Sequence, residues 1–224
     1  MTGQASKLSR NVIGMILISI NVGLPREITH GGRVVTTGIF KAPVAGPVWL
    51  GRLNLMGDGQ ADLRVHGGAD KAVYVYPFEH YAFWAGELGR SNFSHGQFGE
   101  NFTTTGLLEE EIFIGDVFRI GVARVQVTQP RSPCFKLGIR MGDENFPARF
   151  VAVNRTGFYL RVLEEGMVTA GDAIERIERT ADSMNVREMF RLRHAGGTRE
   201  EYERAAQLPA LSPSWRAAFE KRLG

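Results

Sequence analysis

Cys134 is the only cysteine among the 224 residues, and it lies in the stretch QPRSPCFKLG, residues 129–138. Pro130 and Pro133 restrict the backbone on its N-terminal side, and Arg131 and Lys136 bring positive charge. Cationic neighbours stabilise a thiolate and lower the pKa of the thiol. A thiolate can attack as a nucleophile or bind a soft metal, so Cys134 is the candidate catalytic residue and metal ligand. The alternative is a small buried apolar side chain.

Two other kinds of site receive little support from the sequence. A cysteine–histidine hydrolase needs a base beside the thiol, and none of the five histidines stands out for that role. A structural zinc site needs about four Cys or His ligands at short spacings. One cysteine without a suitably spaced histidine pair does not provide them.

The stretch HGGADK, residues 66–71, is a candidate for binding an anion. Paired glycines let the backbone approach a ligand closely, and their N–H groups can form an anion-binding nest. His66 and Lys71 flank the glycines, and Lys71 adds positive charge. Neither nucleotide-binding glycine motif is present. The alternative is a tight turn that joins two strands.

A second polar stretch, GQFGENFTTTG, covers residues 96–106. Asn101 and Thr103 offer neutral donors and acceptors, and Glu100 offers a carboxylate. This set suits recognition of a polar heterocycle or a phosphate. The alternative is a loop whose Asn and Thr side chains satisfy its own backbone.

Three arginines, Arg149, Arg155 and Arg161, recur at six-residue spacing across a predicted hairpin whose turn covers residues 154–157. Regular strand alternation would place arginines on one face, where they could reach the same pocket. Guanidinium groups bind anions in a bidentate manner. The alternative is an exposed, solvated surface.

These residues must be positioned by a β-rich framework over residues 11–178. Short segments rich in Val, Ile, Phe and Tyr are separated by Gly, Pro and Asp, which predicts strands. The predicted strands are 12–21, 34–41, 72–76, 112–120, 123–129, 149–154, 157–162 and 173–179. One helix is expected over residues 77–89, with Pro77 in its first turn. Eight strands predict a closed or nearly closed barrel, because closure removes edge strands.

The pattern becomes helical over residues 179–224. Asn185 with Glu188, and Thr198 with Glu201, have the spacing of capping boxes. Ser212–Pro213 begins a third helix. The protein is therefore expected to be mainly β, α+β as a whole, with a small three-helix bundle. Such a bundle has too few apolar residues to be stable alone, so we expect it to pack on the barrel or on a partner.

Composition excludes several classes of protein. A single cysteine excludes an internal disulfide and a four-thiolate iron–sulfur cluster, and it fits a cytoplasmic location. The apolar run VIGMILISINVGL is shorter than the roughly 20 residues that cross a membrane. The net charge of +3 arises after residue 178, where nine Lys and Arg face six Asp and Glu. This mild excess does not favour nucleic acid as a partner over solvated helix faces.

These segments, in this order, resemble the MOSC domain, named for the C-terminal part of molybdenum cofactor sulfurases, and in particular its compact bacterial YiiM-like members. The resemblance covers about residues 12–178, and the helical tail is similar to the three-helix extension of that subgroup. It is carried by the blocks VGLPREI, TGIFKAPVAGPVWL, GDGQADLRVHGGADKAVYVYPFEHYAFW, GQFGENFTTTGL, GDVFRIG, QPRSPCFKL and RTGFYLRVLEEGMVTAGD.

The resemblance implies a barrel-like fold and a cysteine, here Cys134, that binds molybdenum or carries cofactor sulfur. It implies a molybdenum cofactor and the reduction of N-hydroxylated compounds such as 6-hydroxylaminopurine. Residues of the matching blocks become cofactor-binding candidates: Lys71, Arg131 and Arg155 for the pterin phosphate, Asn101 and Thr103 for the pterin or metal environment, and His66.

The resemblance also bears on partners. Without cluster-binding cysteines, electrons must come from a separate reductase. Pyridoxal phosphate is not expected, because the chain has no separate lysine-bearing cofactor domain. Two alternatives stay open. One is a carrier of the cofactor or of sulfur that uses a Cys134 persulfide, and the other is an interaction module that binds through the helical tail.

Overall fold

The computed structural model describes residues 14–61 and 67–224 of the chain. Eight strands form one sheet in the order β12-β8-β9-β10-β6-β7-β1-β4. Their bounds are β1 Ile16–Val22, β4 Ala42–Val44, β6 Val73–Pro77, β7 Phe102–Thr105, β8 Val117–Ile120, β9 Ala123–Pro130, β10 Phe158–Glu164 and β12 Ile174–Glu178. Neighbouring strands are antiparallel except β6 and β7, which are parallel. The expected β-rich framework is therefore present as a single large sheet.

The expected closed barrel is not confirmed, because β12 and β4 are the two ends of the strand order. The start of β1 does contact the segment that leads into β12. The Leu17 N–H donates to the Asp172 carbonyl at 3.0 Å, and the Gly171 N–H donates to the Leu17 carbonyl at 2.7 Å. Among the described residues one bridge, Ile16 with Ala173, joins them, and the Ile174 N–H donates to the Met15 carbonyl at 2.8 Å. A turn before β12 thus touches β1 where a barrel would need two paired strands.

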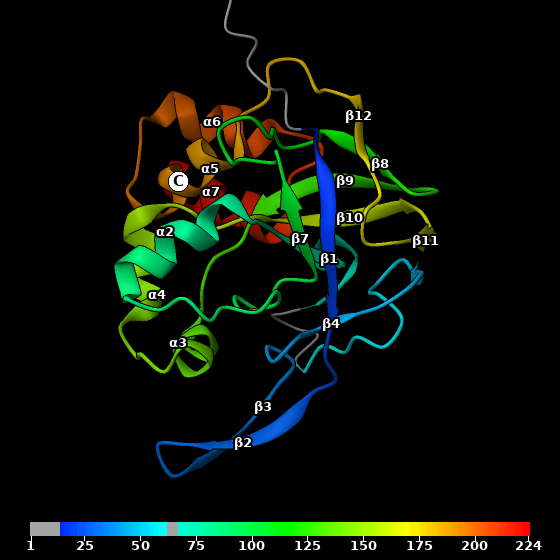
Figure 1. Ribbon diagram of the computed structural model, residues 1–224. Coiled ribbons are helices and arrows are strands. Elements are labelled where there is room, and N and C mark those ends of the chain that lie inside the picture. Colours follow the sequence, from blue (N-terminus) through cyan, green and yellow to red (C-terminus); the bar gives the residue numbers. More distant parts are fainter. Residues whose placement is uncertain (1–13, 62–66) are drawn as a thin grey trace, which may run out of the picture.

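Two smaller pairs of strands lie outside the main sheet. Strand β5 (Val48–Leu50) pairs with β11 (Gly166–Val168), and β2 (Arg26–His30) pairs with β3 (Arg33–Thr37). The β2–β3 hairpin projects from the body of the molecule (Figure 1). Its turn residues Gly31 and Gly32 have φ values of 56° and 73°, which glycine adopts without steric cost.

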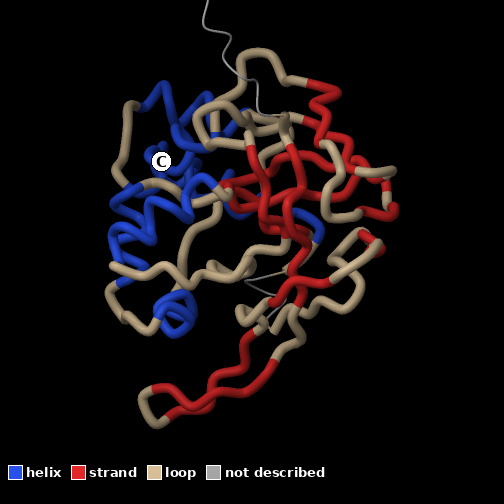
Figure 2. The backbone as a smooth tube through the Cα atoms, viewed as in Figure 1, coloured by secondary structure: helices blue, strands red, loops and turns tan. Residues whose placement is uncertain are grey.

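The longer helices gather on one side of the sheet (Figure 2). They are α2 Glu79–Leu88, α3 Phe135–Met141, α4 Phe146–Val153, α5 Val186–His194, α6 Arg199–Gln207 and α7 Pro213–Leu223, with a short 3-10 helix, η1, at Ala69–Lys71. No helix in the described part of the chain is long and apolar enough to cross a membrane.

The strand predicted over residues 149–154 is wrong, because these residues belong to α4. Their Val and Phe residues form the apolar face of a helix, and Phe146 and Phe150, four residues apart, are both fully buried. Asn154 has a φ of 54° and ends the helix in the left-handed conformation. The Asn and Gly that indicated a hairpin turn therefore belong to a helix C-terminus and the loop after it.

The helix expected over residues 77–89 begins at Glu79, because Pro77 is still part of β6. Gly89 ends it at a φ of 59°, as expected from a C-terminal glycine. Trp84 of this helix stacks on Phe150 of α4, with ring centroids 5.8 Å apart and an interplanar angle of 11°. This packing fixes the position of α4 against α2.

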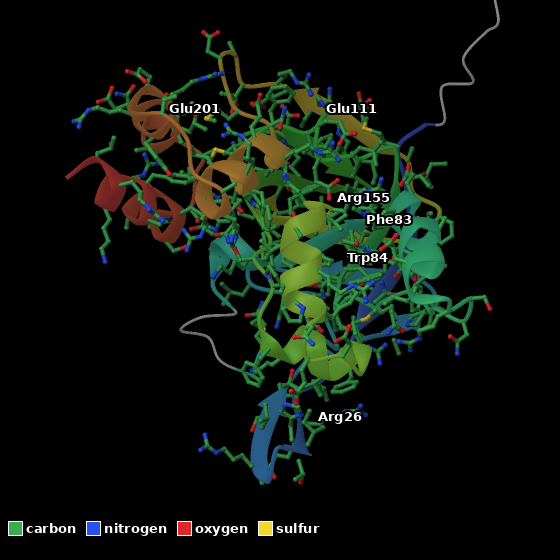
Figure 3. The ribbon with its side chains drawn as sticks, turned by 90° about the vertical axis from the view of Figure 1, so that its left-hand side faces the viewer. Arg26, Phe83, Trp84, Glu111, Arg155 and Glu201 are labelled. Carbon is green, nitrogen blue, oxygen red and sulfur yellow. The ribbon has the colours of Figure 1, made fainter. Side chains whose placement is uncertain are left out.

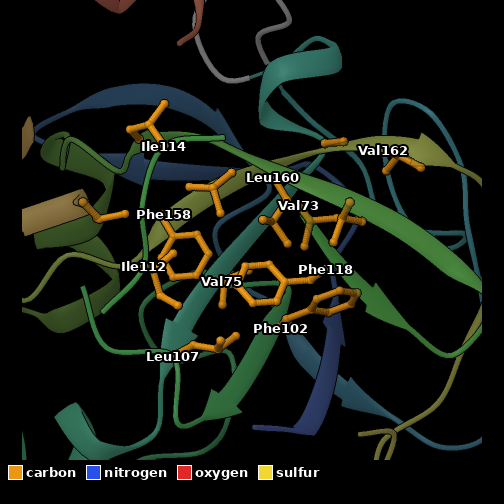
Figure 4. Close-up of a cluster of buried hydrophobic side chains, with 14 of the residues drawn as sticks. Val73, Val75, Phe102, Leu107, Ile112, Ile114, Phe118, Phe158, Leu160 and Val162 are labelled. Atoms are coloured by element: carbon orange, nitrogen blue, oxygen red, sulfur yellow. The ribbon is translucent and has the colours of Figure 1, made fainter. Parts of the chain in front are cut away.

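Both capping boxes of the helical tail are confirmed, on α5 by Asn185 with Glu188 and on α6 by Thr198 with Glu201. Ser212 precedes α7 but forms no side-chain cap bond. Apolar residues of the tail, such as Phe190 and Trp215, join the same buried cluster as the sheet residues shown in Figure 4. The tail therefore packs on the sheet, whereas a domain boundary at residue 179 stays a prediction.

Candidate functional site

A pocket of about 620 Å³, including its open mouth, brings together segments that are far apart in the sequence. Its lining comes from the end of the β2–β3 hairpin, residues 58–61, η1, strands β6 and β10, the loop before β7, and the segment that leads into α3. The lining residues are Thr37, Gly38, Ile39, Lys41, Asp58, Gly59, Gln60, Ala61, Lys71, Tyr74, Gly99, Asn101, Arg131, Cys134, Lys136 and Tyr159.

Cys134 lies at the pocket wall and is partly exposed. It is the residue just before α3, with extended backbone (φ −128°, ψ 172°), and its carbonyl accepts the Leu137 N–H at 2.9 Å. On its N-terminal side, β9 ends at Pro130. The proline-rich loop therefore holds the thiol between the end of a buried strand and the start of a helix.

Arg131 is the most enclosed cation of the pocket, with only 5% of its surface exposed. Its guanidinium carbon lies 5.1 Å from the ring centroid of Tyr74 and 5.4 Å from that of Phe150. Its backbone N–H donates to the Gly157 carbonyl at 3.2 Å. Within the described residues, its buried Nη1 atom has no hydrogen-bond partner. A buried polar atom without a partner costs free energy, so an anion in the pocket would stabilise this side chain.

Lys71 also lines the pocket, at the end of η1. Burial lowers the pKa of Lys71, and the nearby charge of Arg193 lowers it further. The structure thus brings together four of the predicted site residues, Lys71, Asn101, Arg131 and Cys134. His66 lies outside the described residues.

Asn101 lines the pocket, but its side chain is occupied by the protein. Its Oδ1 accepts the Tyr74 N–H at 3.1 Å, and its Nδ2 donates to Asp58 Oδ2 at 2.9 Å. Asn101 is therefore placed to orient Asp58. Thr103 is fully buried in β7 and is not part of the lining. Its hydroxyl accepts from Asn21 Nδ2 at 3.1 Å and donates to Glu100 Oε1 at 2.9 Å.

Glu100, between the pocket-lining residues Gly99 and Asn101 in the chain, is fully buried. It accepts the N–H groups of Gly96 at 2.8 Å and Phe98 at 3.0 Å, and the hydroxyl of Tyr81. Burial raises the pKa of Glu100, and these hydrogen bonds oppose the rise. In the stretch of residues 96–106, Glu100 therefore binds the local backbone N–H groups, whereas the side chains of Asn101 and Thr103 bond to other segments.

The predicted arginine group is not assembled. Arg155 lies over the ring of Phe83, with its guanidinium carbon 4.1 Å from the ring centroid, and does not line the pocket (Figure 3). Arg149 pairs with Asp143 at 3.5 Å, and Arg161 pairs with Asp70 at 2.7 Å. The prediction is wrong because its first strand is a helix, so the three side chains share no face.

Sequence reasoning missed the ion pair between Lys41 and Asp58, both pocket-lining and both nearly buried. Asp58 Oδ1 also accepts the Gly23 N–H at 2.9 Å. Burial lowers the pKa of Lys41, and the adjacent Asp58 opposes that change. The available signal was a lone lysine in the apolar segment TGIFKAPVAGPVWL and a lone aspartate between two glycines.

The charges of the pocket favour an anion beside a thiol. Among the described residues its lining holds four cations, Lys41, Lys71, Arg131 and Lys136, and one carboxylate, Asp58. Cations near a cysteine stabilise the thiolate, and the same cations attract an anionic ligand. The site can therefore bind a group that carries both a negative charge and an atom with affinity for sulfur.

Comparison with known protein families identifies the family of this chain. The model of the MOSC domain matches residues 62–175, which is just over half of the chain. This chain belongs to the MOSC domain family. A second model, the YiiM-like 3-alpha helix domain, matches residues 186–223, which cover the three C-terminal helices. The resemblance that the sequence blocks carried is thus confirmed.

Individual relatives agree with the MOSC assignment. An uncharacterised protein of Bacillus subtilis, YflK, is 45% identical over 207 residues, 92% of this chain and 93% of that protein. A Gibberella moniliformis protein named Reductase is 32% identical over 185 residues, 80% of this chain but 33% of that protein. The crystal structure of YiiM from Geobacillus stearothermophilus, 37% identical, covers 94% of this chain and 100% of its own with a TM-score of 0.80.

Proposed function

We propose that this MOSC protein is a molybdenum-cofactor-dependent oxidoreductase that reduces N-hydroxylated compounds such as 6-hydroxylaminopurine, with Cys134 as the thiolate ligand of molybdenum. The observation that carries the proposal is the position of Cys134 in a cationic pocket beside the buried Arg131. The fungal relative named Reductase supports the reaction class.

The residues present fit this cofactor, which combines a molybdenum ion with a pterin that bears a phosphate. A thiolate is a soft ligand, and the pocket places it beside cationic and polar side chains in one concave site. The Arg131 Nη1 atom, without a partner among the described residues, can donate to a phosphate oxygen. Cys134 would therefore hold the metal, and Arg131 and Lys71 would hold the phosphate.

The reduction consumes two electrons and two protons, and it converts R–NHOH to R–NH₂ and water. When bound, the cofactor supplies the electron-transfer chemistry. The protein supplies position and protons. Lys41 Nζ faces the pocket next to Asp58, whose negative charge favours the ammonium form. In this proposal Lys41 gives a proton to the leaving hydroxyl as the N–O bond breaks, and water supplies the second proton to nitrogen.

The electron source is part of the same proposal. The chain has one cysteine, so a four-thiolate iron–sulfur cluster cannot form within it. We therefore assign electron delivery to a separate cytoplasmic reductase. Pyridoxal phosphate has no role in this scheme.

The test is to purify the protein from a host that makes the cofactor and to measure bound molybdenum and 6-hydroxylaminopurine reduction with reduced viologen. Cys134→Ser is expected to lose both the metal and the activity. Arg149→Ala is the control, because Arg149 lies on α4 outside the pocket. Full metal content and activity in Cys134→Ser would show that the assigned ligand is wrong. A loaded wild-type protein without turnover would instead favour a carrier that uses a Cys134 persulfide.

A further inference from the structure

A second group of cations lies at the edge of the pocket, between α3 and the base of the β2–β3 hairpin. Lys136 and Arg140 are four residues apart on α3, so they share one face of the helix. Lys136 Nζ donates to the Thr36 carbonyl of β3 at 3.0 Å, and Arg140 Nε donates to the Gln97 carbonyl at 3.3 Å. The first bond places Lys136 against the hairpin, and the second holds Arg140 against the loop that contains Gln97.

Arg26 of β2 completes this group, and Figure 3 shows it on the hairpin. The guanidinium carbons of Arg26 and Arg140 lie 3.9 and 5.3 Å from the ring centroid of Phe40. We call Arg26, Lys136 and Arg140 the seam cations. Within the described residues none of the three pairs with a carboxylate, whereas Arg124 and Arg161, for example, do.

Holding like charges together is costly unless an anion binds between them. Burial lowers the pKa of Arg140, the buried Glu100 carboxylate opposes that change, and the charge of Arg26 lowers the pKa further. The side chains of Lys136 and Arg140 are only partly exposed to solvent. A small anion can enter such a seam, whereas the carboxylates of a protein partner would need a more exposed surface.

The cofactor cannot supply this anion if its phosphate is bound by Arg131 and Lys71. Arg140 lies six residues after Cys134, which is about 9 Å along a helix. That separation is of the order of the span of a nucleoside from its base to its 5′ phosphate. The seam cations are therefore placed for a ligand whose reacting end lies near Cys134 and whose charged end lies at the pocket edge.

We infer that the seam cations bind the 5′ phosphate of the substrate, so that the enzyme reduces the N-hydroxylated base as its nucleoside monophosphate. This inference rests on the proposed function and specifies its substrate class. The stoichiometry of the reaction is the same as for the free base. The hydroxylamino group of the nucleotide takes up two electrons and two protons, the N–O bond breaks, and an amino group and water form.

The experiment compares kcat/KM for 6-hydroxylaminopurine and for its ribonucleoside 5′-monophosphate in the cofactor-loaded full-length protein, with reduced viologen as the electron donor. The wild type is expected to prefer the monophosphate by about tenfold or more, the factor that one charge-assisted hydrogen bond provides. Arg140→Ala is expected to reduce this preference to less than about threefold. Arg140→Lys is expected to keep an intermediate preference, because it keeps the charge but loses the planar fork.

Arg149→Ala is the matched control, since it removes a guanidinium of similar exposure that pairs with Asp143. It is expected to keep the wild-type preference. Molybdenum content is measured for every variant, and added salt is expected to weaken reduction of the monophosphate more than reduction of the free base.

Three outcomes would overturn the inference alone. They are equal kcat/KM values for the two compounds in the wild type, an unchanged preference with reduced molybdenum content in Arg140→Ala, and a defect of Arg140→Ala seen only with a protein electron donor. The second would assign the seam cations to the cofactor and the third to donor docking. A loaded wild type that reduces neither compound would overturn the proposed function itself and the inference with it.

Discussion

The ion pair between Lys41 and Asp58 shows how single residues connect stability to the site. The two side chains are 8% and 1% exposed, so both charges are almost fully removed from water. Their desolvation is costly, and the partner charge, the nearby Glu100 carboxylate and the bonds to Asp58 from Gly23 and Asn101 offset that cost. The pocket wall at this point is therefore held by electrostatics rather than by apolar packing.

Replacing Asp58 by Asn is predicted to lower the free energy of unfolding by about 3–5 kcal/mol, because it leaves the Lys41 ammonium buried without a counter-charge. Urea denaturation followed by circular dichroism measures this. The matched control is Asp143→Asn, which removes one partner of the more exposed pair with Arg149 and should cost no more than about 1 kcal/mol.

A second substitution tests whether the unpaired charge of Lys41 causes the loss of stability. Lys41→Met in the Asp58→Asn background should recover part of the lost stability, because it removes the unpaired ammonium. If Asp58→Asn and Asp143→Asn destabilise the protein equally, the buried pair has no special role in holding the pocket wall.

At this scale the sequence predicts residues with distinctive chemistry and misses those whose role depends on burial. Cys134, Arg131 and Lys71 could be selected because a lone thiol, a loop arginine and a glycine-flanked lysine stand out by type and neighbours. Lys41 and Asp58 could not, because their pairing joins positions far apart in the chain and appears only once both are buried.

The secondary-structure elements show where local sequence determines structure and where packing decides. The capping boxes of α5 and α6 involve residues only three positions apart, so the sequence predicts them correctly. Residues 149–154 have the β-branched and aromatic content of a strand, but packing against α2 stabilises a helix. That one error also removed the predicted group of three arginines from the site.

Gly157, just before β10, connects that strand to the pocket through a backbone hydrogen bond with Arg131. It has a φ of 66°, its N–H donates to Glu109 Oε1 at 2.7 Å, and its carbonyl accepts the Arg131 N–H. An added Cβ would lie 2.2 Å from the Val75 carbonyl oxygen, which belongs to the rigid backbone of β6. A side chain at this position therefore requires the start of β10 to move, and Arg131 with it.

Gly157→Ala is accordingly predicted to cost more than the roughly 1–2 kcal/mol of a left-handed residue and, under the proposed function, to reduce the bound molybdenum. Gly31→Ala is the matched control, since Gly31 has a φ of 56° but no atom lies within 4 Å of an added Cβ. It should show only the conformational cost. Denaturation and metal analysis of both variants make the comparison, and equal costs would show that the clash at Val75 is relieved without moving Arg131.

For the whole molecule, the helical tail and the sheet share one apolar core. Met189, Phe190 and Leu192 of α5 belong to the same buried cluster as Phe118 and Leu160 of the sheet. The sequence indicated that the tail needs something to pack on, because its apolar residues are few. It could not show that the tail would complete the core of the sheet, since those contacts join residues far apart in the chain.

A shared core predicts that the chain unfolds as one unit. Phe190, 1% exposed in α5, is a suitable probe, because its replacement by Ala should cost about 3–5 kcal/mol through the cavity it leaves. If sheet and tail are one cooperative unit, calorimetry of Phe190→Ala will show a single transition at lower temperature. Leu53→Ala, at a position 56% exposed, should leave the transition nearly unchanged. Two separate transitions in Phe190→Ala, with the larger one unshifted, would show that the tail folds independently and that its apolar contacts with the sheet contribute little to stability.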